Sequence, residues 1–242
     1  MGEGKAAGAT LVMRLGYRGA GFSGWAEQPG QRTVAGELRG ALETVLRRPI
    51  DMEVAGRTDA GVHALGQYAS APITAQEAAL PGRRLCSSLV ALTSDDLALR
   101  GLYQAPEGFS ARFGAQGRRY RYRLACGMAR PVMAWGHAWW LRGVEHLDVA
   151  AMERAAQALV GEHDFTSFCK ATSAEILARD GRSLCRNLTS IEVTQVCEAG
   201  EELVMVDVRG NAFLHNMVRI IVGSLVEVGR GQRDASWLAD AR

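Results

Sequence analysis

Apolar residues recur along the first half of the chain with the two periods expected of strands and helices. Val34, Leu38, Leu42 and Leu46 repeat with the helical spacing and share one helix face. Shorter apolar runs between glycine-rich segments indicate strands. Together the patterns predict strand, helix, strand, loop, strand, helix and strand, at residues 10–17, 33–48, 51–55, 56–65, 66–71, 82–92 and 97–104. Thr33 is a suitable N-cap for the first helix, and Pro49 is expected to stop it.

The second half repeats this architecture without repeating the sequence. We predict strands at 118–126, 137–141, 186–196 and 202–210, helices at 147–160 and 211–229, a turn at 161–169, a surface loop at 176–185 and a partial helix near the end. The fold class is therefore α+β, with two RRM-like (split βαβ) halves, residues 1–107 and 108–242. RRM sheets often bind RNA, but a fold alone indicates no function.

Composition is that of a globular protein of 242 residues, 48% hydrophobic and 22% charged. No apolar run is long enough to span a membrane. The N-terminal MGEGKAAGAT is short, polar and glycine-rich, without the apolar centre of a signal peptide. We interpret it as a lead-in to the first strand and expect a cytoplasmic protein.

Cysteine and histidine are scattered singly along the chain. The five cysteines form no CxxC pair, and the five histidines form no HxxxH pair. This spacing argues against a disulfide framework and against a zinc site, so we predict no metal.

Positive charge is concentrated in one segment, although the net charge is only +2. Residues 108–144 contain no Asp or Glu and seven arginines: Arg112, Arg118, Arg119, Arg121, Arg123, Arg130 and Arg142. Such a stripe, interleaved with aromatic residues, is typical of a phosphate-binding surface. The alternative is a solvated strand edge protected from aggregation by its arginines.

The segment GRTDAGVHALGQ, from Gly56 to Gln67, is the most distinctive loop of the chain. It places Arg57, Asp59 and His63 among three glycines between two predicted strands. Glycine permits close approach of the backbone to a ligand, so a carboxylate here suits a binding cleft. The alternative is an ordinary turn with a capping Asp.

Two further segments carry residues that core packing alone does not demand. In RRYRYRLAC, period two places Tyr120 and Tyr122 on one strand face and Arg119, Arg121 and Arg123 on the other. The tyrosines are either core residues or contacts to a bound base. In the last long helix, Arg219 lies within an apolar run. It either extends to solvent or meets a carboxylate.

Three motifs in order resemble the signatures of the tRNA pseudouridine synthase A family: GRTDAGVHALGQ, the segment from Phe109 to Tyr122, and FLHNMVRIIVGSL. The resemblance implies that the RRM-like halves share a mostly antiparallel sheet with helices on one face, and that a basic catalytic cleft lies between them. It implies that Asp59 is the catalytic carboxylate, that Arg219 pairs with it, and that Tyr120 packs at the active site.

The family reaction converts uridine to pseudouridine without a redox step, so no cofactor is expected. Asp59 would either attack the nucleotide or stabilise the separated sugar cation. Tyr120 would contact the uracil and help to remove the C5 proton, and Arg57 would fill the space left by the flipped base. Phosphates would be bound by Arg112, Arg118, Arg119, Arg121 and Arg123.

The resemblance also implies a homodimer that acts on the anticodon arm of tRNA. Two other functions remain open. Members of the family continue past the point that corresponds to Arg242 into a final strand, so the chain is alternatively a tRNA-binding relative without catalysis. A glycoside or nucleobase hydrolase would need a second acid, for which Asp164 in GEHDFTSFC is the one weak candidate; His163 and Asp164 are equally well explained as a helix cap and turn.

Overall fold

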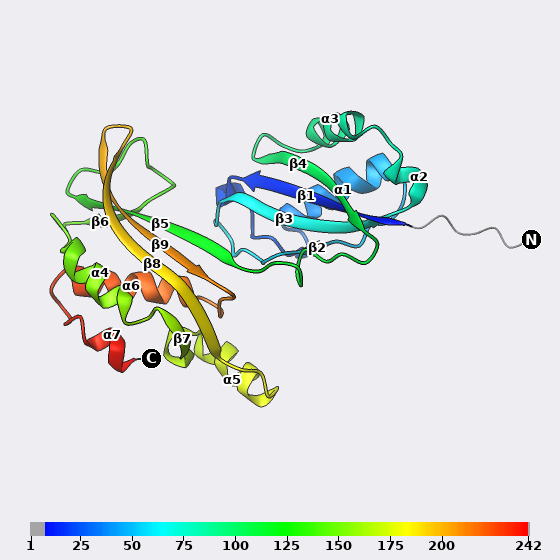
Figure 1. The fold of residues 1–242 in the computed structure, drawn as a ribbon. Helices are drawn as coiled ribbons and strands as arrows, with labels where there is room; N and C mark the ends of the chain where they lie inside the picture. Colours follow the sequence, from blue (N-terminus) through cyan, green and yellow to red (C-terminus); the bar gives the residue numbers. More distant parts are fainter. Residues whose placement is uncertain (1–7, 242) are drawn as a thin grey trace, which may run out of the picture. The chain divides into compact units, whose positions relative to one another are not determined.

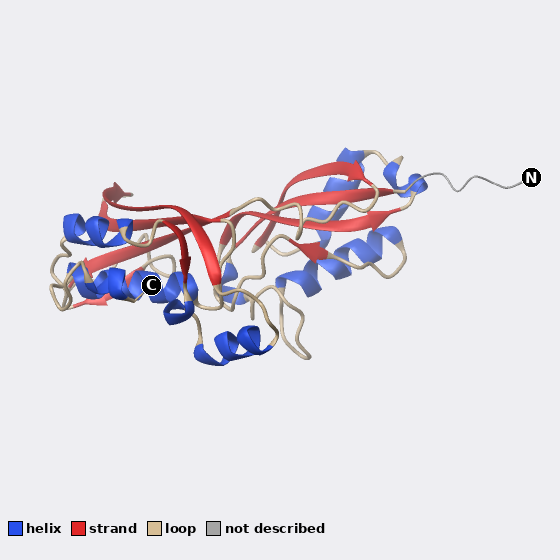
Figure 2. Cartoon of the chain, turned by 60° about the horizontal axis from the view of Figure 1, so that its bottom comes forward, coloured by secondary structure: helices blue, strands red, loops and turns tan. Residues whose placement is uncertain are grey.

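The computed structural model describes residues 8–241, which fold as two compact units divided between Gln116 and Gly117 (Figure 1). Both units combine a sheet with helices, so the predicted α+β class is confirmed (Figure 2). Most of the predicted lead-in, residues 1–7, lies outside the described residues. None of the helices within residues 8–241 is both long and apolar enough to cross a membrane.

Unit 1 contains a four-stranded antiparallel sheet in the order β2-β3-β1-β4. Its strands are β1 (Ala9–Tyr17), β2 (Glu53–Val54), β3 (Ala64–Ile73) and β4 (Leu97–Pro106). Its helices are η1 (Gly19–Gly21), α1 (Val34–Leu46), α2 (Ala75–Ala78) and α3 (Gly82–Leu92). The predicted order of strands and long helices is confirmed, and the short α2, closed by a capping box between Thr74 and Glu77, is added to it.

One face of this sheet forms the core of unit 1. Alternate residues of β1, among them Met13 and Leu15, are fully buried together with Leu38 and Leu42 of α1 and Leu89 of α3. Period two in the strand and the helical period in α1 therefore meet in one apolar layer.

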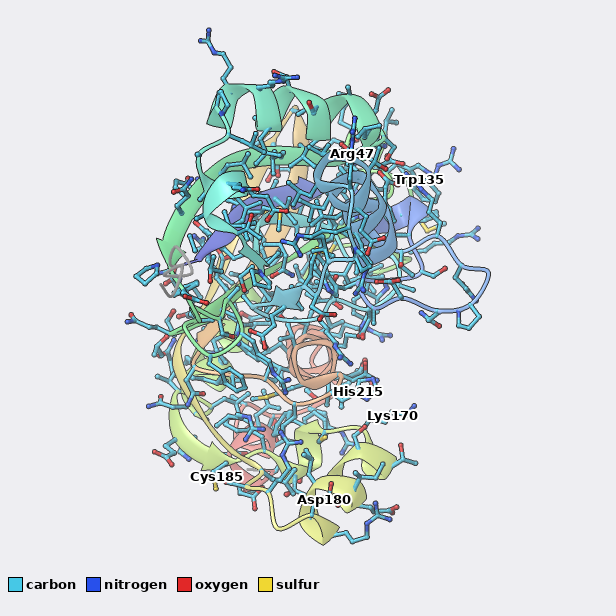
Figure 3. All side chains as sticks on the ribbon, turned by 90° about the vertical axis from the view of Figure 1, so that its right-hand side faces the viewer. Arg47, Trp135, Lys170, Asp180, Cys185 and His215 are labelled. Atoms are coloured by element: carbon cyan, nitrogen blue, oxygen red, sulfur yellow. The ribbon has the colours of Figure 1, made fainter. Side chains whose placement is uncertain are left out.

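The ends of α1 are set by two different devices. Thr33 is the N-cap, as predicted, and its Oγ1 accepts a hydrogen bond from the Gly36 N–H at 3.2 Å. The predicted stop at Pro49 is wrong, because the helix already ends at Leu46. Arg47 takes a left-handed conformation (φ 55°) and donates its N–H to Glu43 O, which turns the chain out of the helix (Figure 3).

Residues 108–116, which the sequence analysis placed in the second half, belong to unit 1. Ala111 is buried and donates its N–H to Ser70 Oγ on β3 at 2.9 Å. The division between the units therefore lies after this segment, where β5 begins.

Unit 2 contains a five-stranded sheet in the order β6-β5-β9-β8-β7. Its strands are β5 (Arg118–Gly127), β6 (Trp139–Arg142), β7 (Gly161–Asp164), β8 (Cys185–Glu198) and β9 (Glu201–Gly210). Its helices are α4 (Val149–Gln157), η2 (Thr166–Phe168), α5 (Ala171–Arg179), α6 (Met217–Gly229) and α7 (Trp237–Asp240). All strand pairs are antiparallel except β5 with β6. The core lies between this sheet and α4 and α6, where Met152, Val206, Val208 and Ile221 are inaccessible to solvent.

Three predictions for unit 2 are wrong in detail. The turn at 161–169 is a strand followed by a 3-10 helix, and α6 begins at Met217 rather than at residue 211. The first residues of the predicted loop at 176–185 are helical, because α5 runs from Ala171 to Arg179. The last two errors share a cause. His215 binds α5 through its backbone carbonyl, which accepts from the Lys170 N–H at 3.1 Å, and through Nδ1, which lies 2.8 Å from Ser173 Oγ (Figure 3). Because Asn216 then adopts a positive φ of 63°, the helix cannot start earlier.

The strands among the described residues form two hydrogen-bonded sheets, one in each unit, where the resemblance implied one shared sheet. Each sheet buries its own apolar face against helices of its own unit. The two cores are therefore built independently.

Candidate functional site

The loop between β2 and β3, which carries Asp59, is fixed from below by a buried hydrogen-bond network. The Tyr17 hydroxyl, at the end of β1, lies 2.8 Å from Thr58 Oγ1. Gln67 Nε2 donates to the Tyr17 hydroxyl at 3.3 Å and to Gly56 O at 2.7 Å. Both Tyr17 and Gln67 are buried, and burial raises the pKa of Tyr17, against the hydrogen bonds from Thr58 and Gln67 that lower it. The tyrosine is therefore neutral at physiological pH and serves as a hydrogen-bonding post under Thr58.

The same loop is held from the side by residues 18–25. Trp25 donates its N–H to Thr58 O at 2.9 Å, and Gly61 donates to Phe22 O at 3.3 Å. Gly24 has a φ of +96°, and a Cβ there would lie 2.9 Å from Thr58 O. Only glycine allows the two loops to approach this closely.

His63 takes part in this packing rather than standing apart from it. The Gly19 N–H donates to His63 Nδ1 at 3.3 Å. A Cβ on Gly19 would overlap the backbone of Val62. His63, which the sequence singled out, and Gly19 and Gly24, which it did not, therefore join the two loops closely.

Asp59 and Arg57 are exposed at the tip of this loop. The backbone closes the turn, because Val62 donates its N–H to Asp59 O at 3.2 Å, and Gly61 supplies the positive φ of 78°. The segment is therefore a turn, as one interpretation of the sequence held. It also holds an exposed carboxylate on a fixed backbone, which the interpretation as a binding loop requires.

Tyr120 and Tyr122 lie on the core side of β5, as the period-two pattern predicted. Both are partly buried and pack against the core of unit 2. The ring of Tyr120 meets that of Phe213 edge to face, with centroids 5.0 Å apart. Phe213 belongs to the non-helical residues before α6, so that segment fixes the orientation of the Tyr120 ring.

The arginines on the other face of β5 are neutralised in part by an acid that the sequence analysis missed. Asp207 on β9 is only 6% exposed and binds Arg119 at 3.1 Å and Arg121 at 2.7 Å. Burial alone would raise the pKa of Asp207, but the hydrogen bonds from Arg121 and Arg119 outweigh it and hold the pKa below its ordinary value. The sequence signal that was overlooked is the single acid in the apolar strand LVMVDVRG. This strand pairs with the arginine-rich strand β5.

The remaining arginines of the stripe have varied surroundings. Arg118 donates to Asn211 O at 2.7 Å, and Arg123 binds Glu198 at 3.0 Å. The guanidinium of Arg112 lies 5.3 Å from the centre of the Phe113 ring in unit 1. The arginine stripe is therefore divided between the two units. It carries a net positive charge only where its arginines outnumber the carboxylates that bind them.

Arg219 is exposed on α6, between the buried Val218 and the half-buried Ile220. The predicted helix of apolar residues therefore accommodates its charge without burying it. Asp164 accepts hydrogen bonds from the N–H and the Oγ1 of Thr166, at 2.8 and 2.5 Å, which lower its pKa. His163 Nε2 lies 3.0 Å from Val160 O. The capping interpretation of these two residues is thus the one that their contacts bear out.

The predicted site residues fall into two groups. Unit 1 carries Arg57, Asp59 and Arg112, and unit 2 carries Arg118, Arg119, Tyr120, Arg121 and Arg219. Within residues 8–241, no three His, Cys, Asp or Glu side chains gather closely enough to hold a metal ion.

Comparison with known proteins gives a consistent result. Residues 155–242 match a family described as tRNA pseudouridine synthase. The chain is 41% identical to tRNA pseudouridine synthase A of Frankia casuarinae, covering 95% of this chain and 79% of the relative. It is 39% identical to the protein of the same name from Geobacter sulfurreducens, over 92% and 85% of the two chains. A solved structure, that of an unknown protein from Galdieria sulphuraria, covers 91% of each chain at 12% identity with a TM-score of 0.23, too low to bear on the fold.

Proposed function

The chain belongs to the tRNA pseudouridine synthase family, and from that premise we propose that it isomerises uridine in the anticodon stem-loop of tRNA, with Asp59 as the catalytic carboxylate. The observation that carries this proposal is the Asp59 loop. An exposed carboxylate stands on a backbone that hydrogen bonds and glycine contacts fix from two sides. Such preorganisation is what a reacting carboxylate needs.

The proposed reaction breaks the bond between sugar C1′ and uracil N1, rotates the base and joins C1′ to C5. C5 loses its proton and N1 gains one, so the product is an isomer of the substrate and no electron acceptor takes part. Asp59 acts either as a nucleophile on the nucleotide or as a counter-charge to the sugar cation. The target base must leave its stack for either course.

Other residues are given roles by the family motifs. We propose that Tyr120 contacts the uracil and assists removal of the C5 proton, and that Arg57 occupies the position of the flipped base. Arg219 is proposed to form an ion pair with Asp59, as the family resemblance implies. Phosphates are proposed to bind Arg112, Arg118, Arg119 and Arg121; the last two share Asp207 and so offer one net positive charge between them.

The proposal extends to the protein as a whole. The strand order β2-β3-β1-β4 of unit 1 is that of a split βαβ unit, which supports RRM-like halves. A catalytic cleft between the halves, a homodimer and a cytoplasmic location are further parts of the proposal and rest on the family resemblance.

The deciding experiment uses unmodified tRNA transcript that carries tritium at uridine C5. We expect the protein to release tritium to water and Asp59→Ala to release none. Asp51→Ala removes an exposed carboxylate of the same unit eight positions away and should release tritium as the unchanged protein does. Release by Asp59→Ala at the normal rate would refute the assigned role.

The products separate the alternative functions. If the unchanged protein bound tRNA tightly but released no tritium, the result would favour a tRNA-binding relative without catalysis. Free uracil with an abasic site in the RNA would favour a hydrolase instead. An intact RNA that contains pseudouridine fits isomerisation alone.

A further inference from the structure

The sheet of unit 1 has a second face, opposite its core, that carries an exposed row of aromatic and basic residues. Register places Arg14 of β1 directly between Tyr68 of β3 and Gly101 of β4. Tyr68 is 40% exposed, and Arg14 is exposed as well. The row therefore crosses β3, β1 and the edge strand β4 at one level.

The ring of Tyr103 completes the row. Tyr103 lies two positions along β4 from Gly101, on the same face, and is 50% exposed. A Cβ on Gly101 would come within 2.6 Å of the Tyr103 hydroxyl and 2.9 Å of its Cζ. The ring thus lies over the glycine, on the strand next to Arg14, and any other residue at position 101 would displace it.

This row occupies the half of the face that the chain leaves open. On the other half, Thr10 and Val12 are buried, and the Ala111 N–H donates to Ser70 Oγ, which register places beside Val12. The open half leads toward the Asp59 loop, because the Ala55 N–H donates to Tyr68 O at 2.9 Å and β1 ends at Tyr17 under Thr58. The aromatic row and the candidate catalytic loop therefore belong to one rigid part of unit 1.

Charge on this face favours an anionic ligand. Among residues 8–241, neither Arg14 nor Arg100 forms an ion pair. Both are exposed, and Arg100 lies next to Gly16 on β1. Glu53, opposite Ser70 on the edge strand, is the acid that register places on this face. Two unpaired guanidiniums and two exposed phenol rings match the phosphates and bases of an unpaired nucleic acid strand.

We propose that Tyr68, Arg14 and Tyr103 form a stacking platform for the unpaired bases of the anticodon loop that flank the target uridine. The identity of the RNA rests on the proposed function, whereas the platform rests on the sheet geometry. The rings and the guanidinium stack on bases through their flat faces, and Arg14 and Arg100 bind the adjoining phosphates. Because every base has such a face, the platform accepts different loop sequences.

The test measures binding of a labelled, unmodified anticodon stem-loop RNA. Each of Tyr68→Ala and Tyr103→Ala should weaken binding by about tenfold or more, as loss of a base–aromatic stack does. Tyr68→Phe and Tyr103→Phe keep the ring and should bind within about twofold of the unchanged protein. Arg14→Ala should reduce the slope of log affinity against log salt by about one.

A second readout distinguishes stacking from a general loss of structure. A fluorescent purine analogue next to the target uridine should be quenched on binding to the unchanged protein and the Phe variants, and unquenched at saturation with the Ala variants. Tritium release should show a raised KM with an unchanged kcat, because the platform does not touch the reacting atoms.

The platform fails if both Ala variants bind RNA as the unchanged protein does, or if Phe and Ala variants are weakened alike. If the Ala variants changed the sedimentation of the protein but bound RNA with unchanged affinity, this face would be a contact between copies of the chain. That result would also overturn the proposal. Failure of the proposed function is seen separately, as absent tritium release by the unchanged protein, and leaves the binding result standing.

Discussion

Tyr17 shows how one buried side chain governs a site that it does not itself enter. Its hydroxyl joins Thr58 to Gln67, and Gln67 in turn holds Gly56. The position of Thr58, next to Asp59, is therefore fixed by a hydrogen bond from the core of unit 1. Tyr17 is thus a positioning residue for Asp59, the proposed catalytic carboxylate.

Tyr17→Phe should separate positioning from binding. The ring keeps its place in the core, but Thr58 and Gln67 lose a buried partner, at a cost of about 1–3 kcal/mol in unfolding free energy. A small displacement of the Asp59 loop should lower kcat by about ten- to a hundredfold, with little change in tRNA affinity. The rate of tritium release measures kcat, and a titration with RNA measures the affinity. Equal losses in kcat and affinity would contradict a positioning role.

The residues of the Asp59 loop were predictable from sequence, but their supports were not. Three glycines around Asp59 signalled a constrained loop in a single stretch of sequence. Tyr17 and Gln67 lie forty-one and nine positions from Thr58, and nothing local marks them as its partners. Hydrogen bonds that cross between strands depend on sheet register, which one sequence specifies only through its buried face.

At the scale of elements, Arg47 ends α1 in a conformation that favours glycine. It is one of three non-glycine residues with positive φ among those described. Because an L side chain is strained there, Arg47→Gly should raise the unfolding free energy by about 0.5–1 kcal/mol. Urea unfolding measures the change. Gly40→Ala in the interior of the same helix, where a Cβ meets no neighbour, should stabilise by a similar amount through helix propensity. A destabilised Arg47→Gly would show that the arginine makes a contact worth more than its strain.

The sheet of unit 2 depends on Asp207, which binds arginines from the neighbouring strand. Asp207→Asn removes the carboxylate that binds both Arg119 and Arg121 and should reduce stability by about 1–2 kcal/mol at pH 7, since both guanidiniums are nearly half exposed. The pKa of Asp207 is lower in the folded protein than in the unfolded chain. The carboxylate therefore stabilises fully above the unfolded value of about 3.9, and this contribution disappears as pH falls through the folded pKa.

The difference in stability between the protein and Asp207→Asn should thus be constant near neutrality and shrink below about pH 4. The same variant releases two guanidiniums for phosphate binding, so tRNA affinity should rise while stability falls. Unfolding at several pH values and RNA binding at fixed salt measure the two effects. Unchanged RNA affinity would remove Arg119 and Arg121 from the proposed phosphate-binding set.

The start of α1 was predicted well because a periodic apolar pattern coincided with the N-cap Thr33. Helix positions were missed where a distant contact decided the outcome. The start of α6 is displaced by six residues because His215 binds α5, and α5 itself has no acidic first turn and no side-chain N-cap to announce it. Asp207 was overlooked for the same reason: its meaning comes from strand pairing and not from its neighbours in sequence.

On the scale of the whole molecule, the two units have separate sheets and separate cores, yet the proposed site residues are divided between them. Residues 1–116 and 117–242 are each of a size that can bury most of the apolar surface of an independent domain. Each core draws its strands and helices from its own unit. We therefore expect each half, expressed alone, to unfold cooperatively on heating, with the circular dichroism of a mixed helix and sheet structure.

Neither half alone should release tritium from tRNA, because Asp59 belongs to one and Tyr120 and Arg219 to the other. Mixing the halves should restore activity with a dependence on their concentration, since the linked chain provides a high effective concentration that separate halves lack. Asp59→Ala in the first half should abolish the restored activity, and Asp51→Ala should leave it. If the second half alone were active, Asp59 could not be the catalytic carboxylate. If each half folded but no mixture were active at any concentration, the division of the site between the two units would be refuted.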